Sequence, residues 1–327
     1  MKHTHDRECS TWKGGRQGWL LESFAMKKNA FVPMCDSLEG RTMLSHVAPH
    51  IVGDVLPHPI ALGVYTPASG TLFGPNGPSP LDVRQGNVGD CWLIASLAEV
   101  ASSNPQAITS MFTSLGTVNN GGPVPIQYYG VRFYNPQGAA KTFVVENELP
   151  TIARNGMVVY DQPINGVLWV ALAEKAYVEA ASAGWVVNSI TYNAKPCLDT
   201  YNDVAGGEPR WAIQAITGER AFENYNSTIT EWTAATIIAQ LATPGSMVVL
   251  GTPMTDTSGL IVQDHAYAVI GYDPTTQLFT LENPWNISQG MNSLYNSGTV
   301  REVYGSEFTC SADVINSGAF QTDDWLI

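Results

Sequence analysis

The sequence predicts an α+β protein with two lobes, a helical lobe followed by a β-rich lobe. Three observations favour this class. The chain has 327 residues, enough for one large core or two modest ones. Helical patterns dominate the first part of the folded body and strand patterns the second, which is typical of segregated lobes. An apolar content of 44%, a charged content of 14% and many Gly and Pro residues indicate an ordinary globular protein rather than a disordered one.

Residues 1–75 are predicted to form an N-terminal extension, a pro-segment or a targeting segment. They are rich in His, Pro and Gly and show no sustained periodicity. A small folded element is the alternative. Met26 is followed by "KKNAF", a plausible second translation start. The stretch "LEGRTMLS", Leu38 to Ser45, resembles a short N-terminal motif of bacterial surface and secreted proteins. We favour a cytoplasmic location, with export through this motif as the alternative.

Residues 76–205 are the predicted helical lobe, and its first element is a buried helix. Apolar and small residues dominate from Cys91 to Ala101 over three turns. Asn104 and Pro105 then end the helix, because proline cannot continue the hydrogen-bond ladder.

The rest of this lobe is predicted to hold a hairpin and a second helix. "YYGVRFYNPQGAAKTFVVENELP" contains two strand-like runs around the turn "NPQG". "VLWVALAEKAYVEAASAGW" predicts an amphipathic helix that stops at Gly184. One face of it would carry Leu168, Leu172, Ala176 and Tyr177.

Residues 206–327 are the predicted β-rich lobe, after a junction at "YNDVAGGEPR". One helix is expected in "WTAATIIAQLATPG". Four strands are expected in "SMVVLGTP", "DHAYAVIGYD", "QLFTLENPW" and "TVREVYG", which alternate or run apolar between turn residues.

The net charge of the chain limits the classes of partner that it is expected to bind. The net charge is −13, so nucleic-acid binding is not expected, because an acidic body repels phosphates. The same field favours cationic substrates or divalent cations, although a merely solubilising surface is the alternative. No run of about 18 apolar residues occurs, and we therefore expect no membrane span.

Five cysteines are present, and Cys91 stands out among them. Their number is odd and no CxxC pair occurs, which argues against a disulfide scaffold, a structural zinc site and a redox motif. Cys91 lies at a predicted helix N-terminus, where a nearby imidazolium can lower a thiol pKa from about 8.5 and create a nucleophilic thiolate. Gly86 and Gly89 would let the preceding backbone turn sharply, and Gln85 could donate an amide N–H to an oxyanion.

His265 is the one histidine that follows Cys91. The other histidines are His3, His5, His46, His50 and His58, all in the predicted extension. An imidazole needs a partner that fixes its orientation, and Asn283 on the next predicted strand could supply it, with Trp285 covering the contact. Each residue also has a common structural role: a buried apolar cysteine, a satisfied strand histidine, and a turn asparagine before proline.

The combination of "QGNVGDCW", "DHAY" and "ENPW" resembles the calpain family of papain-like cysteine endopeptidases. "FVVENELPT" and "LWVALAEKAY" extend the likeness to about residues 75–310, the protease core. The resemblance implies a papain-like fold that cleaves protein or peptide substrates through an acyl-enzyme thioester. The resemblance implies that Cys91, on the helical lobe, is the nucleophile. On the β lobe, it implies that His265 is the general acid and base and that Asn283 orients its ring. It further implies that Gln85 and the Cys91 N–H form the oxyanion hole and that Trp285 shields the site. The oligomeric state is left open.

The resemblance also implies calcium sites, which this sequence matches in part. Asp82 and the Gly77 carbonyl agree with positions of the first site, but its glutamate is missing, because the chain reads "PINGV" before Leu168 and Trp169. Calcium needs six to eight oxygen ligands. We therefore expect catalysis without a cofactor, with calcium dependence as the alternative. A second departure is Asn286, which stands where the family usually has glycine after "NPW".

Two competing functions remain. An acyltransferase of the transglutaminase type would use a similar triad, but those enzymes generally have Asp where this chain has Asn283. A catalytically silent calpain-like binding module is the other alternative. The intact set of Cys91, His265 and Asn283 argues against it.

Overall fold

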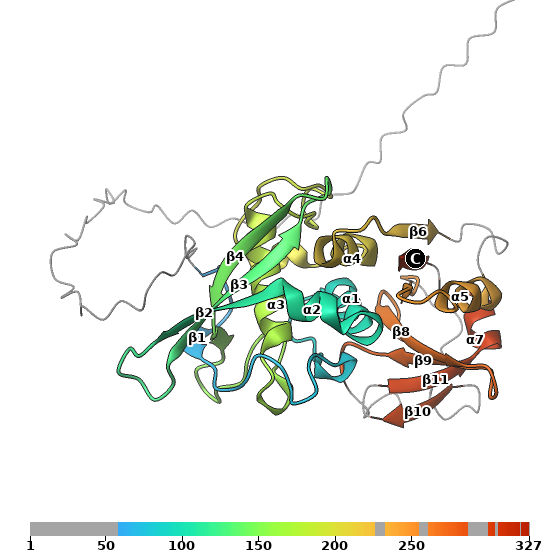
Figure 1. The fold of residues 1–327 in the computed structure, drawn as a ribbon, viewed down its shortest axis with the longest axis horizontal. Coiled ribbons are helices and arrows are strands. Elements are labelled where there is room, and N and C mark those ends of the chain that lie inside the picture. Colours follow the sequence, from blue (N-terminus) through green and yellow to red (C-terminus); the bar gives the residue numbers. More distant parts are fainter. Residues whose placement is uncertain are drawn as a thin grey trace, which may run out of the picture. The chain divides into compact units, whose positions relative to one another are not determined.

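A computed structural model describes residues 58–225, 233–254, 261–286, 300–304, 307–320 and 322–326. All of them belong to one compact unit, His46–Ile327 (Figure 1). The predicted alternative start and export motif lie outside the described residues. Within the described part, no helix is long and apolar enough to cross a membrane.

The helices lie mostly in the first two thirds of the chain. They are α1 (Cys91–Ser103), α2 (Pro105–Met111), α3 (Trp169–Ser182), α4 (Pro209–Thr217), α5 (Ala234–Leu241) and α7 (Ala312–Asn316). Short 3-10 helices span Pro80–Asp82, Ile164–Gly166 and Tyr201–Val204. Together with the strands below, they confirm the predicted α+β class.

Helix α1 begins at Cys91 and ends where the sequence predicts. Asn104 leaves the helical conformation, with φ −145° and ψ 69°. The same asparagine starts an unpredicted helix. Its side chain accepts a hydrogen bond from Ala107 N at 3.1 Å, and Pro105 occupies the first turn of α2. Asparagine is a strong N-cap and proline fits a first turn, so this pair both stops α1 and begins α2.

The prediction that α3 is amphipathic is wrong. Of its 14 residues, 13 are buried, among them Glu174, Lys175 and Glu179. Polar side chains can be buried when they are hydrogen-bonded, and the Lys175 ammonium donates to the Glu146 carboxylate and to the carbonyl of Glu148 at 3.0 Å. Neighbouring elements therefore cover the face that the sequence pattern assigned to solvent. The helix does stop at the predicted place, just before Gly184.

Two small sheets accompany these helices. The predicted hairpin is confirmed as β3 (Ile126–Tyr134) and β4 (Ala140–Glu146), and β2 (Phe112–Val118) extends it to three antiparallel strands. A second sheet joins β1 (Val64–Pro67) to β5 (Glu148–Thr151). Residues 64–67 fall within the predicted extension, but the structure pairs them with the folded body.

A seven-stranded antiparallel sheet is formed by the last third of the chain. Its strand order is β10-β11-β9-β8-β7-β12-β6. The strands are β6 (Phe222–Tyr225), β7 (Met247–Gly251), β8 (Ala266–Asp273), β9 (Leu278–Glu282), β10 (Val300–Tyr304), β11 (Glu307–Ser311) and β12 (Thr322–Leu326). The four predicted strands are β7 to β10. Near the end of the chain, β12 inserts between β6 and β7, a pairing that local sequence patterns cannot specify.

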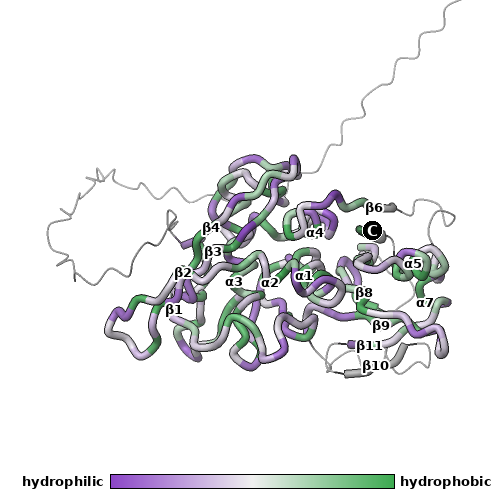
Figure 2. Tube along the Cα trace, viewed as in Figure 1, coloured by the Kyte–Doolittle hydropathy of each residue, from purple (hydrophilic) through white to green (hydrophobic). Residues whose placement is uncertain are grey.

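Strands β7 and β8 separate two apolar clusters. Alternate residues of both strands belong to different clusters. The cluster that includes α1 contains Met247, Val249, Ala266 and Ala268. The cluster that includes α5 and α7 contains Val248, Leu250, Tyr267 and Val269. Alternate residues of a strand face opposite sides of a sheet, so continuous apolar runs suit strands that are buried on both faces. Figure 2 shows the apolar character of α5 and of the neighbouring strands.

One buried carboxyl group connects α1 to this sheet. Glu99 of α1 is 1% exposed, and its Oε1 accepts hydrogen bonds from Val248 N at 3.3 Å and Ser103 Oγ at 2.9 Å. Burial raises the pKa of this carboxyl to about 8. The folded protein therefore keeps a proton on Glu99 that the unfolded chain releases near its ordinary pKa of about 4.3.

We expect the free energy of unfolding to fall as the pH rises from about 5 to 8, because over this range the folded state binds more protons than the unfolded state. Glu99→Gln removes this contribution. The free energy of unfolding of the variant minus that of the wild type should therefore be higher at pH 8 than at pH 5, by roughly 1–3 kcal/mol. Denaturant unfolding at both pH values measures the difference. The exposed Glu219→Gln is the control. Equal pH dependence in wild type and Glu99→Gln would contradict the assignment.

Candidate active site

One cavity of about 820 Å³ brings most of the predicted site residues together. Gln85, Gly89, Cys91, His265 and Trp285 all line it. Other lining residues come from the chain at 205–209, from β6 and from the end of β7. The cavity therefore lies where the N-terminal end of α1 meets the large sheet, and Figure 1 shows α1 beside β8.

The loop before α1 presents Cys91 to this cavity. Cys91 is the first residue of the helix and is partly exposed. A Cβ atom at Gly86 would lie 2.1 Å from the carbonyl oxygen of Tyr160, so only glycine fits there. A Cβ at Gly89 would meet nothing within 4 Å. The predicted need for glycine at a sharp turn thus has a steric basis at Gly86 and none at Gly89, where the missing side chain leaves room beside Cys91.

The expectation of a lowered thiol pKa is wrong for this structure. Burial, followed by the charge of Asp90, raises the pKa of Cys91 to about 12. Backbone N–H groups of Ala266 and Trp92 act in the opposite direction but do not outweigh these effects. Asp90 is fully buried, directly before the helix. Its carboxyl therefore opposes the helix N-terminus that was expected to favour a thiolate.

His265 and Asn283 form the predicted pair. His265 Nε2 and Asn283 Oδ1 lie 2.9 Å apart, and both residues are buried. They flank the paired strands β8 and β9, whose antiparallel register confirms the predicted adjacency. Thr252, at the end of β7, holds the histidine backbone, since its Oγ1 accepts from His265 N at 2.9 Å and its N–H donates to His265 O at 2.8 Å. No motif of the sequence points to Thr252.

These contacts define the protonation of the imidazole. Asn283 Oδ1 is an acceptor, because Trp285 N also donates to it at 3.0 Å, so His265 Nε2 carries a hydrogen. Burial lowers the pKa of His265 to about 4, against the opposing effect of the Asn283 contact. The ring is therefore neutral at pH 7, with Nδ1 as its basic nitrogen. Among the described residues, no hydrogen-bond partner occupies Nδ1.

Trp285 covers the histidine as predicted. The two ring centroids lie 4.5 Å apart at an interplanar angle of 46°. An apolar ring at this distance excludes water from the imidazole and its asparagine partner, which strengthens their hydrogen bond.

Hydrogen bonds tie the turn after Asn283 to the loop before Cys91. Gln85 N donates to Pro284 O at 2.8 Å, and Asn286 Nδ2 donates to Val83 O at 3.0 Å. Asn286 has φ +48°, the left-handed region that glycine adopts freely and asparagine tolerates. The replacement of the expected glycine by Asn286 therefore keeps the turn and adds a side-chain tie.

Gln85 lines the cavity, with its amide engaged. Its Nε2 donates to Val88 O at 2.7 Å, and its Oε1 is buried without a hydrogen-bond partner among the described residues. The oxyanion role of Gln85 stays a prediction.

The residues at the implied calcium position do not fit a calcium ion. Asp82 supplies the matched carboxylate, and its Oδ2 accepts from Trp169 Nε1 at 2.7 Å and from Ser79 N at 2.9 Å. The position of the missing glutamate provides only Gly166 and Val167. Calcium requires six to eight oxygens, usually with several carboxylates, and this donor set falls well short.

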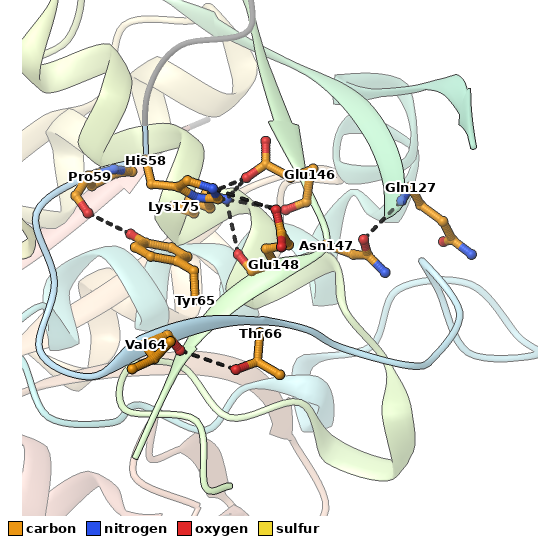
Figure 3. A network of polar contacts seen from close by, with 10 residues as sticks. All are labelled: His58, Pro59, Val64, Tyr65, Thr66, Gln127, Glu146, Asn147, Glu148 and Lys175. Atoms are coloured by element: carbon orange, nitrogen blue, oxygen red, sulfur yellow. Dashed lines mark hydrogen bonds and ion pairs between the residues drawn. The ribbon is translucent and has the colours of Figure 1, made fainter. Parts of the chain in front are cut away.

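The described residues contain a single other group that could be considered for a metal, formed by His58, Glu146 and Glu148 (Figure 3). A lysine already supplies positive charge there. The fully buried Lys175 Nζ bonds to the Glu146 carboxylate and lies 3.2 Å from His58 Nδ1. A divalent ion would be repelled by this ammonium, so the group is a structural network that ties residue 58 to the body.

Comparison with known proteins shows the family of the chain. Residues 66–297 match the model of a family described as "Calpain family cysteine protease". Similar curated proteins include Calpain-13 of Rattus norvegicus (27% identical, over 65% of this chain and 31% of that protein), Calpain-8 of Homo sapiens (25%, over 81% and 35%) and Calpain clp-4 of Caenorhabditis elegans (25%, over 68% and 30%). The chain thus spans about a third of the length of these relatives.

Proposed function

The chain belongs to the calpain family of cysteine proteases, and we propose that it is a cysteine endopeptidase that acts through Cys91, His265 and Asn283. One observation carries the proposal. The contact between His265 Nε2 and Asn283 leaves the basic Nδ1 without a hydrogen-bond partner among the described residues, and His265 and Cys91 line the same cavity. A thiol, a neutral base and an orienting amide are the parts that thiol-dependent acyl transfer requires.

The protonation states of the site favour a concerted attack over a preformed ion pair. Both Cys91 and His265 are neutral near pH 7, since burial raises the pKa of the thiol and lowers that of the imidazole. His265 Nδ1 therefore takes the thiol proton as sulfur bonds to the scissile carbonyl carbon. The Cys91 N–H and the Gln85 amide stabilise the oxyanion.

Attack of the sulfur gives a tetrahedral intermediate, and its breakdown completes the first half of the reaction. The C–N bond breaks, His265 returns the proton to the leaving amine, and a thioester on Cys91 remains. Water, deprotonated by His265, then attacks the thioester and releases the acid product together with the free thiol. In this papain-like scheme the helical lobe carries Cys91 and the β-rich lobe carries His265 and Asn283, with the peptide extended between them.

A single assay separates peptide hydrolysis from the competing functions. The purified chain is incubated with casein and, in parallel, with a glutamine-containing peptide and a labelled primary amine. We expect casein fragments and no amine incorporation, together with labelling of Cys91 by a peptidyl epoxide ahead of Cys197 and Cys310. Amine incorporation without cleavage would indicate a transglutaminase. A chain that neither cleaves nor labels would be a silent binding module.

The casein assay, repeated with calcium and with a chelator, tests the expectation that catalysis needs no calcium. Because Asp82 Oδ2 is already hydrogen-bonded and the expected glutamate is missing from the sequence, we expect the casein rate to change by less than about twofold between millimolar calcium and excess chelator. Asp82→Asn should be equally insensitive to calcium. A rate that falls tenfold or more with chelator would show that other residues bind an activating ion.

A further inference from the structure

The charged side chains that line the cavity are all acidic. Glu208, Glu223 and Asp264 line it, and no Lys or Arg does so among the described residues. Asp264 is exposed and directly precedes His265, and its charge is felt at the Cys91 thiol. The acidity of the whole chain therefore extends into the place where a peptide would bind.

Glu208 and Glu223 converge on one cation of the chain itself. Arg210 Nε lies 2.6 Å from Glu208 Oε2 and 3.3 Å from Glu223 Oε2, and Arg210 Nη2 also bonds to Glu208. Glu208 immediately precedes α4, whereas Glu223 lies on β6, so the pair exists only in the folded protein. Two carboxylates and one guanidinium leave one negative charge, to which Asp264 adds another.

The surroundings of this pair suit a cation better than a neutral or acidic group. The Glu208 and Glu223 side chains are 30% and 21% exposed, so water screens them only in part. Burial, followed by the charge of Glu208, raises the pKa of Glu223. This direction is expected when like charges lie close together without full compensation, and a second cation would relieve their repulsion.

We propose that Glu208 and Glu223, aided by Asp264, select peptides that carry a Lys or Arg side chain close to the bond that is cut. This inference rests on the proposed peptidase function of the same cavity. The cationic side chain of the peptide lies beside Arg210 rather than replacing it and neutralises the excess negative charge. Acidic side chains at the same position are excluded by repulsion.

Matched peptides test the selection. Fluorogenic substrates that differ only in Lys, Gln or Glu at one position are compared, for each of the three positions on either side of the scissile bond. At one position or more, we expect kcat/KM to follow Lys above Gln above Glu, with a Lys to Gln ratio of about fivefold. The ratio should shrink as ionic strength rises, because salt screens partly exposed charges.

Charge-removing variants identify the groups responsible. In Glu223→Gln/Asp264→Asn the remaining Glu208–Arg210 pair is neutral, so the Lys to Gln ratio should fall to about one. Glu219→Gln removes an exposed acid outside the cavity and should leave the ratio unchanged. Binding of the same peptides to Cys91→Ala, measured by calorimetry, provides a readout that does not require turnover.

The possible outcomes are distinct. If the wild type cleaves the Lys, Gln and Glu peptides equally at every position, the charge selection is wrong and the peptidase function stands. A Lys preference that survives in Glu223→Gln/Asp264→Asn would also overturn the assignment to these residues. If no peptide is cleaved and Cys91 does not react with the epoxide, the proposed function itself falls. Equal binding of the three peptides by Cys91→Ala would then overturn the selection separately.

Discussion

Cys91→Ser is expected to reduce kcat/KM for casein or a peptide substrate by about 10⁴-fold or more. A serine hydroxyl has nearly the shape of the thiol and fits the same helix start. It is a far weaker nucleophile, because the partly buried site holds a neutral base that is adapted to a thiol. Since Cys91 is partly exposed at the cavity, the loss should occur without a comparable loss of stability. Steady-state kinetics together with denaturant unfolding separate the two effects.

Cys197→Ser is the matched control for this variant. Cys197 is also a partly exposed free thiol with a raised pKa, but it does not line the cavity. We expect its activity to stay within about twofold of the wild type. Wild-type activity in Cys91→Ser would show that another group, or a contaminating protease, carries the reaction.

The second large effect is expected at the imidazole. His265→Ala removes the base and should lower kcat/KM by about 10³-fold or more, with the casein assay as the measurement. Asn283→Ala keeps the base but removes the hydrogen bond to Nε2 and the acceptor for Trp285 N, so a smaller loss of about 10- to 100-fold is expected. An Asn283→Ala variant as active as the wild type would mean that packing against Trp285 alone orients the ring.

The pH dependence distinguishes an orienting role of Asn283 from a purely structural one. His265 must be neutral to accept the thiol proton, and its pKa is lowered to about 4, so wild-type kcat/KM should fall as the pH is lowered toward 4. Asn283→Asp places a carboxylate against Nε2 and favours the imidazolium. The acidic limb of the kcat/KM profile should therefore move to higher pH by about one pH unit or more. An unmoved limb would indicate that Asn283 does not contact the working imidazole.

Much of the fold could be predicted because it is encoded over short stretches of chain. Asn104 and Pro105 end α1 through their own conformational limits, whereas Gly184 follows the end of α3 because glycine adopts the left-handed conformation, here with φ +67°. Elements without such signals were missed. Strand β12 gains its place by pairing with β6 and β7, which are distant in the chain, and the polar side of α3 is buried by partners that no periodicity can reveal.

The candidate site also contains residues that the sequence predicts and one that only the structure reveals. Cys91, His265, Asn283 and Trp285 were found from residue type, from scarcity and from the order of neighbouring strands, and the structure brings them together around one cavity. Their catalytic roles remain predictions. Thr252 was not foreseen, because a threonine at a strand end carries no signal of its own.

By itself, then, the sequence determined which chemical groups this protein has for a reaction, since a thiol, an imidazole and an amide are properties of residue types and of the short motifs around them. Only the tertiary structure decided the charges on those groups and the electrostatic character of the cavity. Burial and Asp90 keep the Cys91 thiol protonated, and Arg210 draws Glu208 and Glu223 together from separate elements. The physical reason is that ionisation depends on solvent exposure and on neighbours in space, and folding creates both.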